Sequence, residues 1–324
     1  SAPGAVIQVR NADSAICTDC VEYLRAAHAA TGKPAMLVSS RQGTGSDPQV
    51  VAVTREGFPV LDGVAPFLKG VKHLLAYRDA RGRTEPEPAA ADDEQVQLWR
   101  QKLAGADMLD ETEAMQLIAA FGVRVVASHV AESVDEAVAH AESVGYPVVM
   151  KTLAPGIAHK TEAGGVKLHL ECADQVRQAH ADLAARLGPR VLVAPMVTTP
   201  GVELVLGCVR DPQFGPLVMI GFGGIYAEVL KDSVFCLPPF GPETVLRRIA
   251  DLRLRPLLDA QRGRPALDLA AFARAASRFS VLASSLGDAI AEIDVNPIHV
   301  MPDGCVALDA LVVPVRQHSR KVER

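Results

Sequence analysis

The sequence predicts an α/β fold with at least two hydrophobic cores. Its 324 residues are 49% hydrophobic but only 4% aromatic, so Ala, Val and Leu must fill the interior. That composition suits an α/β architecture better than an all-β sandwich. Helix-like and strand-like segments alternate along most of the chain, and a hydrophilic linker at residues 78–95 divides them. A chain of this length is expected to form more than one domain.

Residues 1–77 are predicted to be the last part of a parallel α/β domain. A helix is expected at 21–30, then a turn, then a buried strand at 35–39. A glycine-rich loop and an apolar segment ending at Tyr77 follow. Nothing before residues 5–9 could supply the rest of such a sheet. We therefore expect two α/β units of a domain that begins elsewhere.

A second unit is predicted over residues 96–315, with a tail at 316–324. Two capping boxes, Asp110 to Glu113 and Ser133 to Glu136, indicate where its first helices begin. The further elements expected are strands 123–130, 148–152, 166–170 and 191–197, helices 173–187, 242–251 and 267–286, mostly strand over 202–237, and a closing hairpin after 290.

The closing hairpin contains a predicted metal site. Alternation along a strand puts four residues on one face: Glu292, Asp294, Asn296 and Ile298. The dipeptide Asp303-Gly304 suits a two-residue turn, which would set Ile298 opposite Asp309 and make Asn296 and Asp309 diagonal neighbours. Oxygen ligands of this kind suit Mg²⁺. The alternative is an edge hairpin with a solvated acidic face.

Lys151 ends an apolar strand and precedes the loop 153–165. A lysine on a buried strand needs a carboxylate or a phosphate as partner. Gly156, Gly164 and Gly165 would let backbone N–H groups approach an anion closely. The alternative is a surface loop with a lysine whose charged end reaches solvent.

Glu203 interrupts an apolar run and is predicted to be buried, so it would need ligand hydroxyls or a cation. The glycines at 221–224 resemble a dinucleotide fingerprint only superficially, because the third glycine and the following helix are lacking. A glycine turn between strands fits this segment better.

Bulk properties exclude several functions. A net charge of −5 gives no field that attracts nucleic acid or an acidic membrane. The six cysteines are scattered, including a lone Cys17-x-x-Cys20, and form no disulfide framework. No run of 18 apolar residues is present. We expect a soluble cytoplasmic protein; the sequence leaves open whether it forms a homo-oligomer.

Several motifs in one order carry a family resemblance: Lys151, residues 159–166, Glu203, residues 210–216, residues 221–224, and residues 292–297 with 309–310. The series resembles the ATP-grasp portion of NDP-forming acyl-CoA synthetases, the ADP-forming acetate–CoA ligases related to succinyl-CoA synthetase. The resemblance implies an ATP-grasp fold of two α+β lobes over 96–315. Residues 1–77 resemble the tail of the flavodoxin-like CoA-ligase domain. The CoA-binding and phosphohistidine domains have no counterpart in the sequence and would be partners.

The resemblance also implies the cofactors, ATP or ADP with Mg²⁺, and a set of roles. Lys151 would contact the phosphates, and Gly164 and Gly165 would fold over them. Adenine would be recognised by backbone groups of a hinge formed by Ala194, Pro195, Met196 and Val197. Glu203 would bind the ribose, and Asn296 and Asp309 would hold Mg²⁺. Asp294 would lie beside the arriving phosphohistidine, and His159 would relay the phosphoryl group. The CoA site would lie mostly outside this chain.

The reaction implied for the whole enzyme converts an acid, CoA and ATP reversibly to acyl-CoA, ADP and phosphate through phosphohistidine. This chain would carry the nucleotide half. Two alternatives remain open: an ATP-grasp carboxylate–amine ligase, which has no need of His159, and a non-catalytic nucleotide-binding regulatory module. One departure from the family pattern is Ala260, where a glycine is usual; it puts a local turn in doubt and not the nucleotide site.

Overall fold

The computed structural model describes residues 6–7, 18–39, 44–82, 86–157, 160–224, 232–260 and 265–315. Contacts divide the chain into two units, Ser1–Thr84 and Glu85–Arg324. The boundary falls inside the hydrophilic stretch 78–95. Within the described residues, every helix is too short or too polar to cross a membrane.

The first unit is a parallel α/β arrangement. Its sheet has the order β1-β2-β3, with both strand pairs parallel. The strands are β1 (Val6–Ile7), β2 (Leu37–Ser39) and β3 (Val60–Asp62), and the helices are α1 (Thr18–Thr31), η1 (Thr44–Ser46), α2 (Pro48–Arg55) and α3 (Val64–Arg81). Leu24, Leu37 and Phe58 are among the residues of its small core. The helix and strand expected at 21–30 and 35–39 correspond to α1 and β2.

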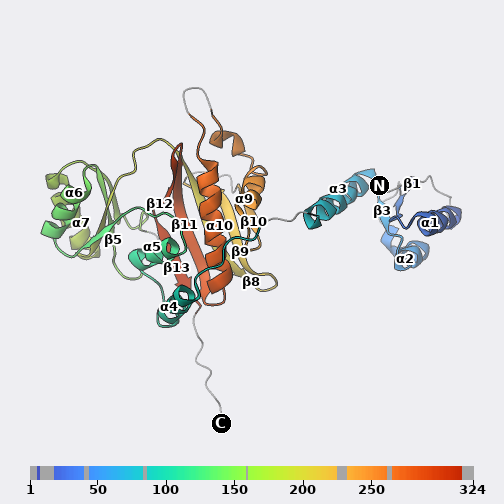
Figure 1. Ribbon diagram of the computed structural model, residues 1–324, viewed down its shortest axis with the longest axis horizontal. Coiled ribbons are helices and arrows are strands. Elements are labelled where there is room, and N and C mark those ends of the chain that lie inside the picture. The colour runs from blue at the N-terminus through green and yellow to red at the C-terminus, as the bar shows by residue number, and fades with distance from the viewer. Residues whose placement is uncertain are drawn as a thin grey trace, which may run out of the picture. The chain divides into compact units, whose positions relative to one another are not determined.

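The second unit has two lobes, and the smaller one contains an antiparallel sheet. Its sheet has the order β4-β7-β5-β6. The strands are β4 (His129–Ala131), β5 (Val148–Thr152), β6 (Val166–Leu170) and β7 (Val191–Pro195), and the helices are α6 (Val134–Val144) and α7 (Ala173–Leu187). Met150, Leu183 and Val193 belong to the core between this sheet and its two helices. The sheet and the helices together form the green lobe in Figure 1.

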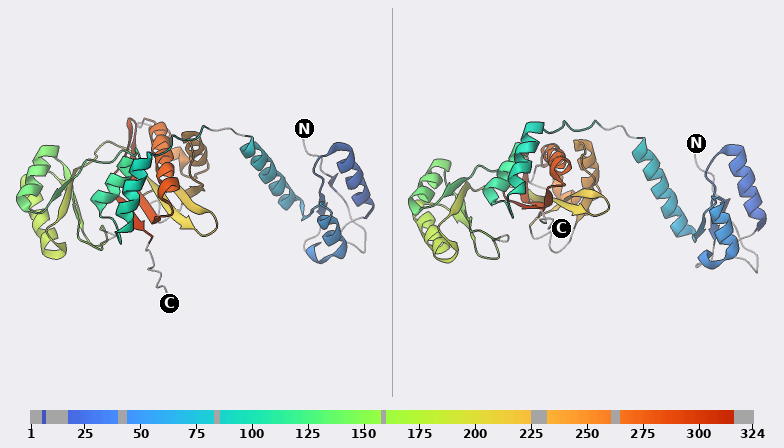
Figure 2. Two further views of the ribbon diagram at one scale, coloured as in Figure 1. Left: turned by 60° about the horizontal axis from the view of Figure 1, so that its bottom comes forward. Right: turned by 90° about the horizontal axis from the view of Figure 1, so that it is seen from below.

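A larger sheet forms the second lobe, in the order β10-β9-β8-β11-β12, with β13 also paired to β11. Its strands are β8 (Val202–Asp211), β9 (Gly215–Phe222), β10 (Ser233–Cys236), β11 (Ile290–Met301), β12 (Gly304–Ala307) and β13 (Ala310–Pro314). Its helical elements are α4 (Asp93–Ala104), α5 (Glu111–Ala120), α9 (Pro242–Ile249), η2 (Arg255–Leu258) and α10 (Leu269–Leu286). The views in Figures 1 and 2 show α10 lying along this sheet, where Phe272 and Phe279 are fully buried.

The predicted strand 123–130 is divided between the lobes. Val125 bridges to Ala307 in the larger lobe, and Val126 donates its N–H to the Ala307 carbonyl at 2.9 Å. Only His129–Ala131 pairs with the smaller sheet, through β7. One uninterrupted strand was therefore a wrong prediction, because this segment crosses from one lobe to the other.

The start of α5 agrees with the predicted capping box. The Asp110 carboxylate accepts the Glu113 N–H at 2.9 Å, and the Glu113 carboxylate accepts the Asp110 N–H at 3.2 Å. These bonds satisfy two backbone donors that a helix N-terminus leaves without intrahelical partners. They also fix Glu111 as the first residue of α5, which matters for the site below.

The closing hairpin has a different register from the one predicted. Met301 pairs with Gly304, so Pro302 and Asp303 form the turn, and Ile298 pairs with Ala307 instead of Asp309. Pairing between β11 and β8 also shifts between Val295 and Ile298, which moves Ile298 onto the buried face. Pro297 has no N–H to donate to a ladder, so a strict two-residue alternation fails there.

Candidate functional site

Lys151 lies at the end of β5 with its side chain directed at two carboxylates. Its Nζ donates to Glu111 Oε1 at 2.7 Å, to Asp309 Oδ2 at 2.9 Å and to the Leu308 carbonyl at 2.8 Å. The residue is only 8% exposed. A buried lysine is expected to have a carboxylate partner, and Lys151 has two. Burial lowers the pKa of Lys151, but Asp309 and Glu111 together outweigh it and raise the pKa above 10.5.

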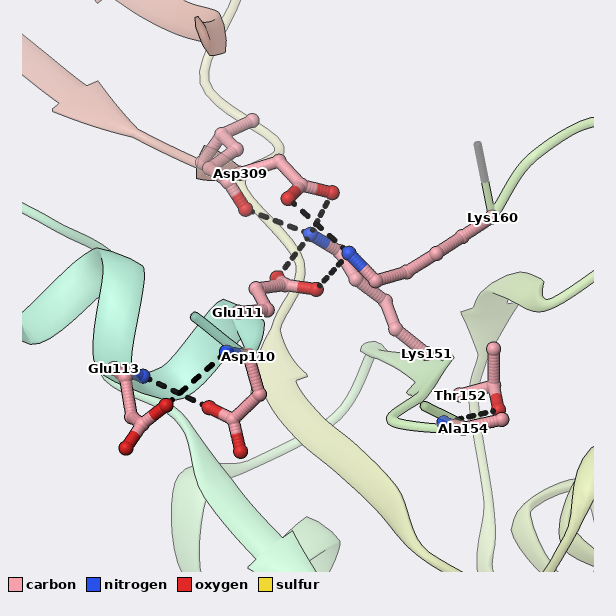
Figure 3. A network of polar contacts seen from close by, with 9 residues as sticks. Asp110, Glu111, Glu113, Lys151, Thr152, Ala154, Lys160 and Asp309 are labelled. Atoms are coloured by element: carbon pink, nitrogen blue, oxygen red, sulfur yellow. Dashed lines mark hydrogen bonds and ion pairs between the residues drawn. The ribbon is translucent and has the colours of Figure 1, made fainter. Parts of the chain in front are cut away.

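A second lysine completes the cluster. Lys160 Nζ lies 2.8 Å from Glu111 Oε2 and 3.5 Å from Asp309 Oδ1. The four side chains of Glu111, Lys151, Lys160 and Asp309 thus alternate in sign, and we call them the charge ring (Figure 3). Three separate parts of the fold supply them: the first turn of α5, the end of β5 with its following loop, and the segment between β12 and β13.

The ring is strongly buried on its Glu111 side. The Glu111 side chain is 1% exposed, against 10% for Lys151, 13% for Lys160 and 27% for Asp309. Its charge is tolerated because both oxygens face ammonium groups and because the N-terminus of α5 favours an anion. With two positive and two negative groups, the ring has no net charge. An arriving polyanion would therefore have to compete for lysines that already have partners.

Sequence reasoning missed Glu111 and gave Lys160 no role of its own. A signal for Glu111 existed, because residues 111, 114, 115 and 118 form one helical face, and all four are buried. An acidic residue on such a face predicts a cationic partner. Only the structure identifies that partner.

A cavity of roughly 450 Å³ opens beside the ring. Glu111 and Lys160 belong to its wall, together with Leu153, Ile157 and Arg190. Arg190 is held by Asp110 at 3.1 Å. The volume falls within the range of small-molecule sites.

The expected metal ligands are neighbours, although not through the predicted register. Asn296 donates its backbone N–H to the Asp309 carbonyl at 3.2 Å. No group of three or more His, Cys, Asp or Glu side chains suited to a metal exists among the described residues. One amide and one carboxylate fit Mg²⁺, which keeps waters and takes phosphate oxygens as further ligands. Both oxygens of the Asp309 carboxylate already face ammonium groups, so a metal ion there would compete with the two lysines for it.

Asp294 is half-buried on β11, opposite Gly207 of β8 and Leu311 of β13. Glu203 is exposed on β8, so the prediction of a buried carboxylate was wrong. Its carbonyl accepts the Gly223 N–H at 2.8 Å, and a Cβ on Gly224 would lie 2.6 Å from its Oε2. The glycine turn expected after β9 therefore leaves room for the Glu203 carboxylate.

The hinge residues lie at the end of β7. Ala194 is buried, while Pro195, Met196 and Val197 are half-buried. The Met196 N–H donates to the Pro147 carbonyl at 2.9 Å, so this amide already has a partner within the fold.

The two loop glycines also have local partners. Gly164 donates its N–H to Thr161 at 3.0 Å, and Gly165 donates to Lys160 at 2.7 Å. A Cβ on Gly165 would lie 2.6 Å from Thr152 Cγ2, so this position requires glycine for close packing. Covering phosphates would require both N–H groups to change partners. His159 lies outside the described residues.

Comparisons with known proteins agree with this architecture. A family profile described as an ATP-grasp domain matches residues 101–313. The β subunit of acetate–CoA ligase (ADP-forming) I from Pyrococcus furiosus is 37% identical over 213 residues, which are 63% of this chain and 91% of that subunit. Acetate–CoA ligase (ADP-forming) I from Archaeoglobus fulgidus is 29% identical over 309 residues, 90% of this chain but 44% of that protein.

Among solved structures, a dinucleotide-forming acetyl-coenzyme A synthetase 1 from Candidatus Korarchaeum cryptofilum matches with a TM-score of 0.62 and 32% identity. The match covers 69% of this chain and 100% of that one. The chain belongs to the ATP-grasp family. Within that family it is the ATP-grasp part of an ADP-forming acyl-CoA synthetase, which confirms the fold and the class of enzyme expected from the motif series.

Proposed function

We propose that this chain binds Mg²⁺-ADP or Mg²⁺-ATP at the charge ring and carries the nucleotide half-reaction of an acid–CoA ligase. The observation that carries the proposal is the pair of lysines converging on Asp309, the buried Lys151 at 2.9 Å and the half-buried Lys160 at 3.5 Å. Phosphoryl transfer depends chiefly on positioning and on neutralising charge at the phosphate oxygens. Two ammonium groups already held close together supply both.

Each residue would then have a defined task. Lys151 and Lys160 bind phosphate oxygens, and Asn296 and Asp309 hold Mg²⁺, which when bound neutralises charge between the phosphates. Glu203, with room left by Gly224, binds the ribose, and the hinge 194–197 holds adenine. Gly164 and Gly165 shape the loop over the phosphates.

The whole reaction would be acid, CoA and ATP giving acyl-CoA, ADP and phosphate through phosphohistidine. A structure of the Korarchaeum enzyme, 33% identical with a TM-score of 0.59, is described as a complex with coenzyme A and Mg-AMPPCP whose phosphohistidine segment points towards the nucleotide-binding site. By analogy, the partners of this chain are domains or subunits that bind CoA and carry that histidine, with Asp294 close to it. CoA would bind mostly to those partners.

His159 would relay the phosphoryl group between that histidine and ADP, because a neutral imidazole can accept it through a ring nitrogen. In the complete enzyme, His159→Ala should abolish net acyl-CoA synthesis and leave ADP affinity within a few-fold. Formation of phosphohistidine from acyl-CoA and phosphate should survive. Near-normal turnover of the variant would remove His159 from the mechanism.

Nucleotide binding is the decisive test. Calorimetry should detect Mg²⁺-ADP binding to the chain, and ligand at a hundredfold excess over Kd should stabilise it by about 2.7 kcal/mol in thermal unfolding. Lys151→Met should remove most of the binding, whereas Lys167→Met, on the neighbouring strand β6, should not. A wild-type chain that shows neither heat nor a melting shift at millimolar nucleotide would refute the proposal.

The two alternatives receive less support, because the relatives reported above are named as CoA ligases. We also propose that the chain works in a reducing compartment such as the cytoplasm. Cys172, Cys208, Cys236 and Cys305 are free thiols, as a reducing compartment would keep them. Lack of affinity for nucleic acid stays a prediction from the sequence, and the sequence leaves open whether the chain forms a homo-oligomer.

A further inference from the structure

Asp309 has two tasks that conflict in the charge ring. Both of its carboxylate oxygens face ammonium groups, Oδ2 at 2.9 Å from Lys151 and Oδ1 at 3.5 Å from Lys160. A carboxylate held in this way offers little negative charge to a metal ion. Under the proposed function the same carboxylate must bind Mg²⁺, so something must keep the lysines in place when Asp309 leaves them.

Glu111 has the geometry for that task. Its two oxygens lie at similar distances from the two lysines, Oε1 at 2.7 Å from Lys151 as a hydrogen bond and Oε2 at 2.8 Å from Lys160 as an ion pair without hydrogen-bond geometry. It holds Lys160 more closely than Asp309 does, since the Asp309 contact is 3.5 Å. With its side chain 1% exposed at the first position of a capped helix, Glu111 has no competing water shell and little freedom to move.

Counting charges shows what Glu111 changes. When Asp309 withdraws from the ring, the two lysines and Glu111 leave a net charge of +1. Without Glu111 the remainder would be +2, with two ammonium groups close together in a buried site. The Asp309 carboxylate would then be the sole ring counter-ion for both lysines and would be harder to withdraw.

We propose that Glu111 is a positioning residue that anchors Lys151 and Lys160 as a phosphate clamp and thereby frees Asp309 for Mg²⁺. The inference deepens the proposed nucleotide function and rests on it. Glu111 itself touches neither nucleotide nor metal; it acts through the lysines. Its effect is therefore on the dependence of nucleotide binding upon Mg²⁺.

The test is calorimetric titration of the full chain with ADP over a series of Mg²⁺ concentrations. In Glu111→Gln, the Mg²⁺ concentration that gives half of the metal-dependent gain in ADP affinity should rise about tenfold, as the loss of one close charge pair implies. ADP affinity without Mg²⁺ should be equal or higher, because the site is more positive. A merely structural role would weaken ADP binding equally with and without the metal.

Two further variants make the test specific. Glu113→Gln alters the same helix and the wall of the same cavity, but the Glu113 carboxylate accepts the Asp110 N–H and is not part of the charge ring. The Mg²⁺ requirement of this variant, meaning the Mg²⁺ concentration that gives half of the metal-dependent gain in ADP affinity, should equal that of the wild type. In the double variant Glu111→Gln with Lys160→Gln, withdrawal of Asp309 again leaves +1, so the Mg²⁺ requirement should return towards the wild-type value.

Glu111→Asp keeps the charge with a shorter side chain and serves if Glu111→Gln does not fold; its Mg²⁺ requirement should lie between those of the wild type and the Gln variant. An unchanged Mg²⁺ requirement in a folded Glu111 variant, or no recovery in the double variant, would overturn the inference. A wild-type chain that binds no nucleotide would instead contradict the proposed function.

Discussion

Lys151→Met isolates the energetic role of the ring, because methionine keeps an apolar stem and loses the ammonium group. The variant leaves Glu111 Oε1, Asp309 Oδ2 and the Leu308 carbonyl without this donor. Removing one partner of a buried ion pair costs about 3–5 kcal/mol. Lys160 still lies 2.8 Å from Glu111 and Asp309 is 27% exposed, so we expect the lower end, about 3 kcal/mol.

For a unit of this size, about 3 kcal/mol corresponds to a melting temperature lower by about 6–12 °C. Thermal unfolding followed by circular dichroism at pH 7 measures it. Lys167→Met is the matched control, since Lys167 pairs with Asp182 at 2.6 Å but the two side chains are 33% and 44% exposed. An exposed pair contributes less than about 1 kcal/mol.

The effect should also depend on pH in one direction. The pKa of Lys151 in the folded protein is raised above its ordinary value of 10.5. Its contribution to stability is therefore complete below pH 10.5 and is lost as pH rises through the higher folded value. The difference in melting temperature between the wild type and Lys151→Met should accordingly become smaller in strong alkali. Equal melting temperatures at pH 7 would refute the argument, because the ring would then contribute no net stability.

Further expectations concern packing, acid stability and the metal. Gly165→Ala would place its Cβ 2.6 Å from Thr152 Cγ2 and should lower the free energy of unfolding, measured with denaturant, by about 1–3 kcal/mol. Gly105→Ala, whose new Cβ would have its nearest contact at 4.0 Å, should leave that free energy nearly unchanged. Burial raises the pKa of Asp232, but the N–H groups of Leu254 and Arg253 outweigh it and lower the pKa below 3.8. Asp232→Asn should therefore lose about 1–3 kcal/mol at pH 7, a difference that disappears as pH falls through the lowered pKa; a constant difference across pH 2–7 would contradict this. Asp309→Ala should weaken ADP binding in the presence of Mg²⁺ and leave metal-free binding equal or tighter, because the lysines lose a competitor; equal losses in both titrations would indicate a structural role for the hairpin.

Local signals in the sequence predicted local structure well. The capping box at Asp110 and Glu113 is present with both bonds, because its geometry depends on residues three apart. Lys151 lies at the end of a buried strand beside carboxylates, as its cost of burial requires. The order of the motifs along the chain was sufficient to recognise the family.

Predictions that assumed an unbroken strand failed. Asn296 and Asp309 are neighbours, but through a backbone hydrogen bond at the junction of β12 and β13 and not through the proposed hairpin register. Glu203 is exposed although its neighbours in sequence are apolar. The pattern along one strand could show neither where its partner strand shifts nor which of its residues stay exposed to solvent.

The sequence by itself determined the fold class and the family, because these depend on composition, periodicity and motif order. The residues that bind nucleotide stay a prediction from the family resemblance. The tertiary structure alone decided how the charges are paired. Lys151 meets Glu111 from 40 residues away and Asp309 from 158 residues away. An ion pair depends on the distance between side chains in space, and here that distance is set by how α5, β5 and the β12–β13 segment pack together. The sequence contains the four charges, and packing turns them into one site.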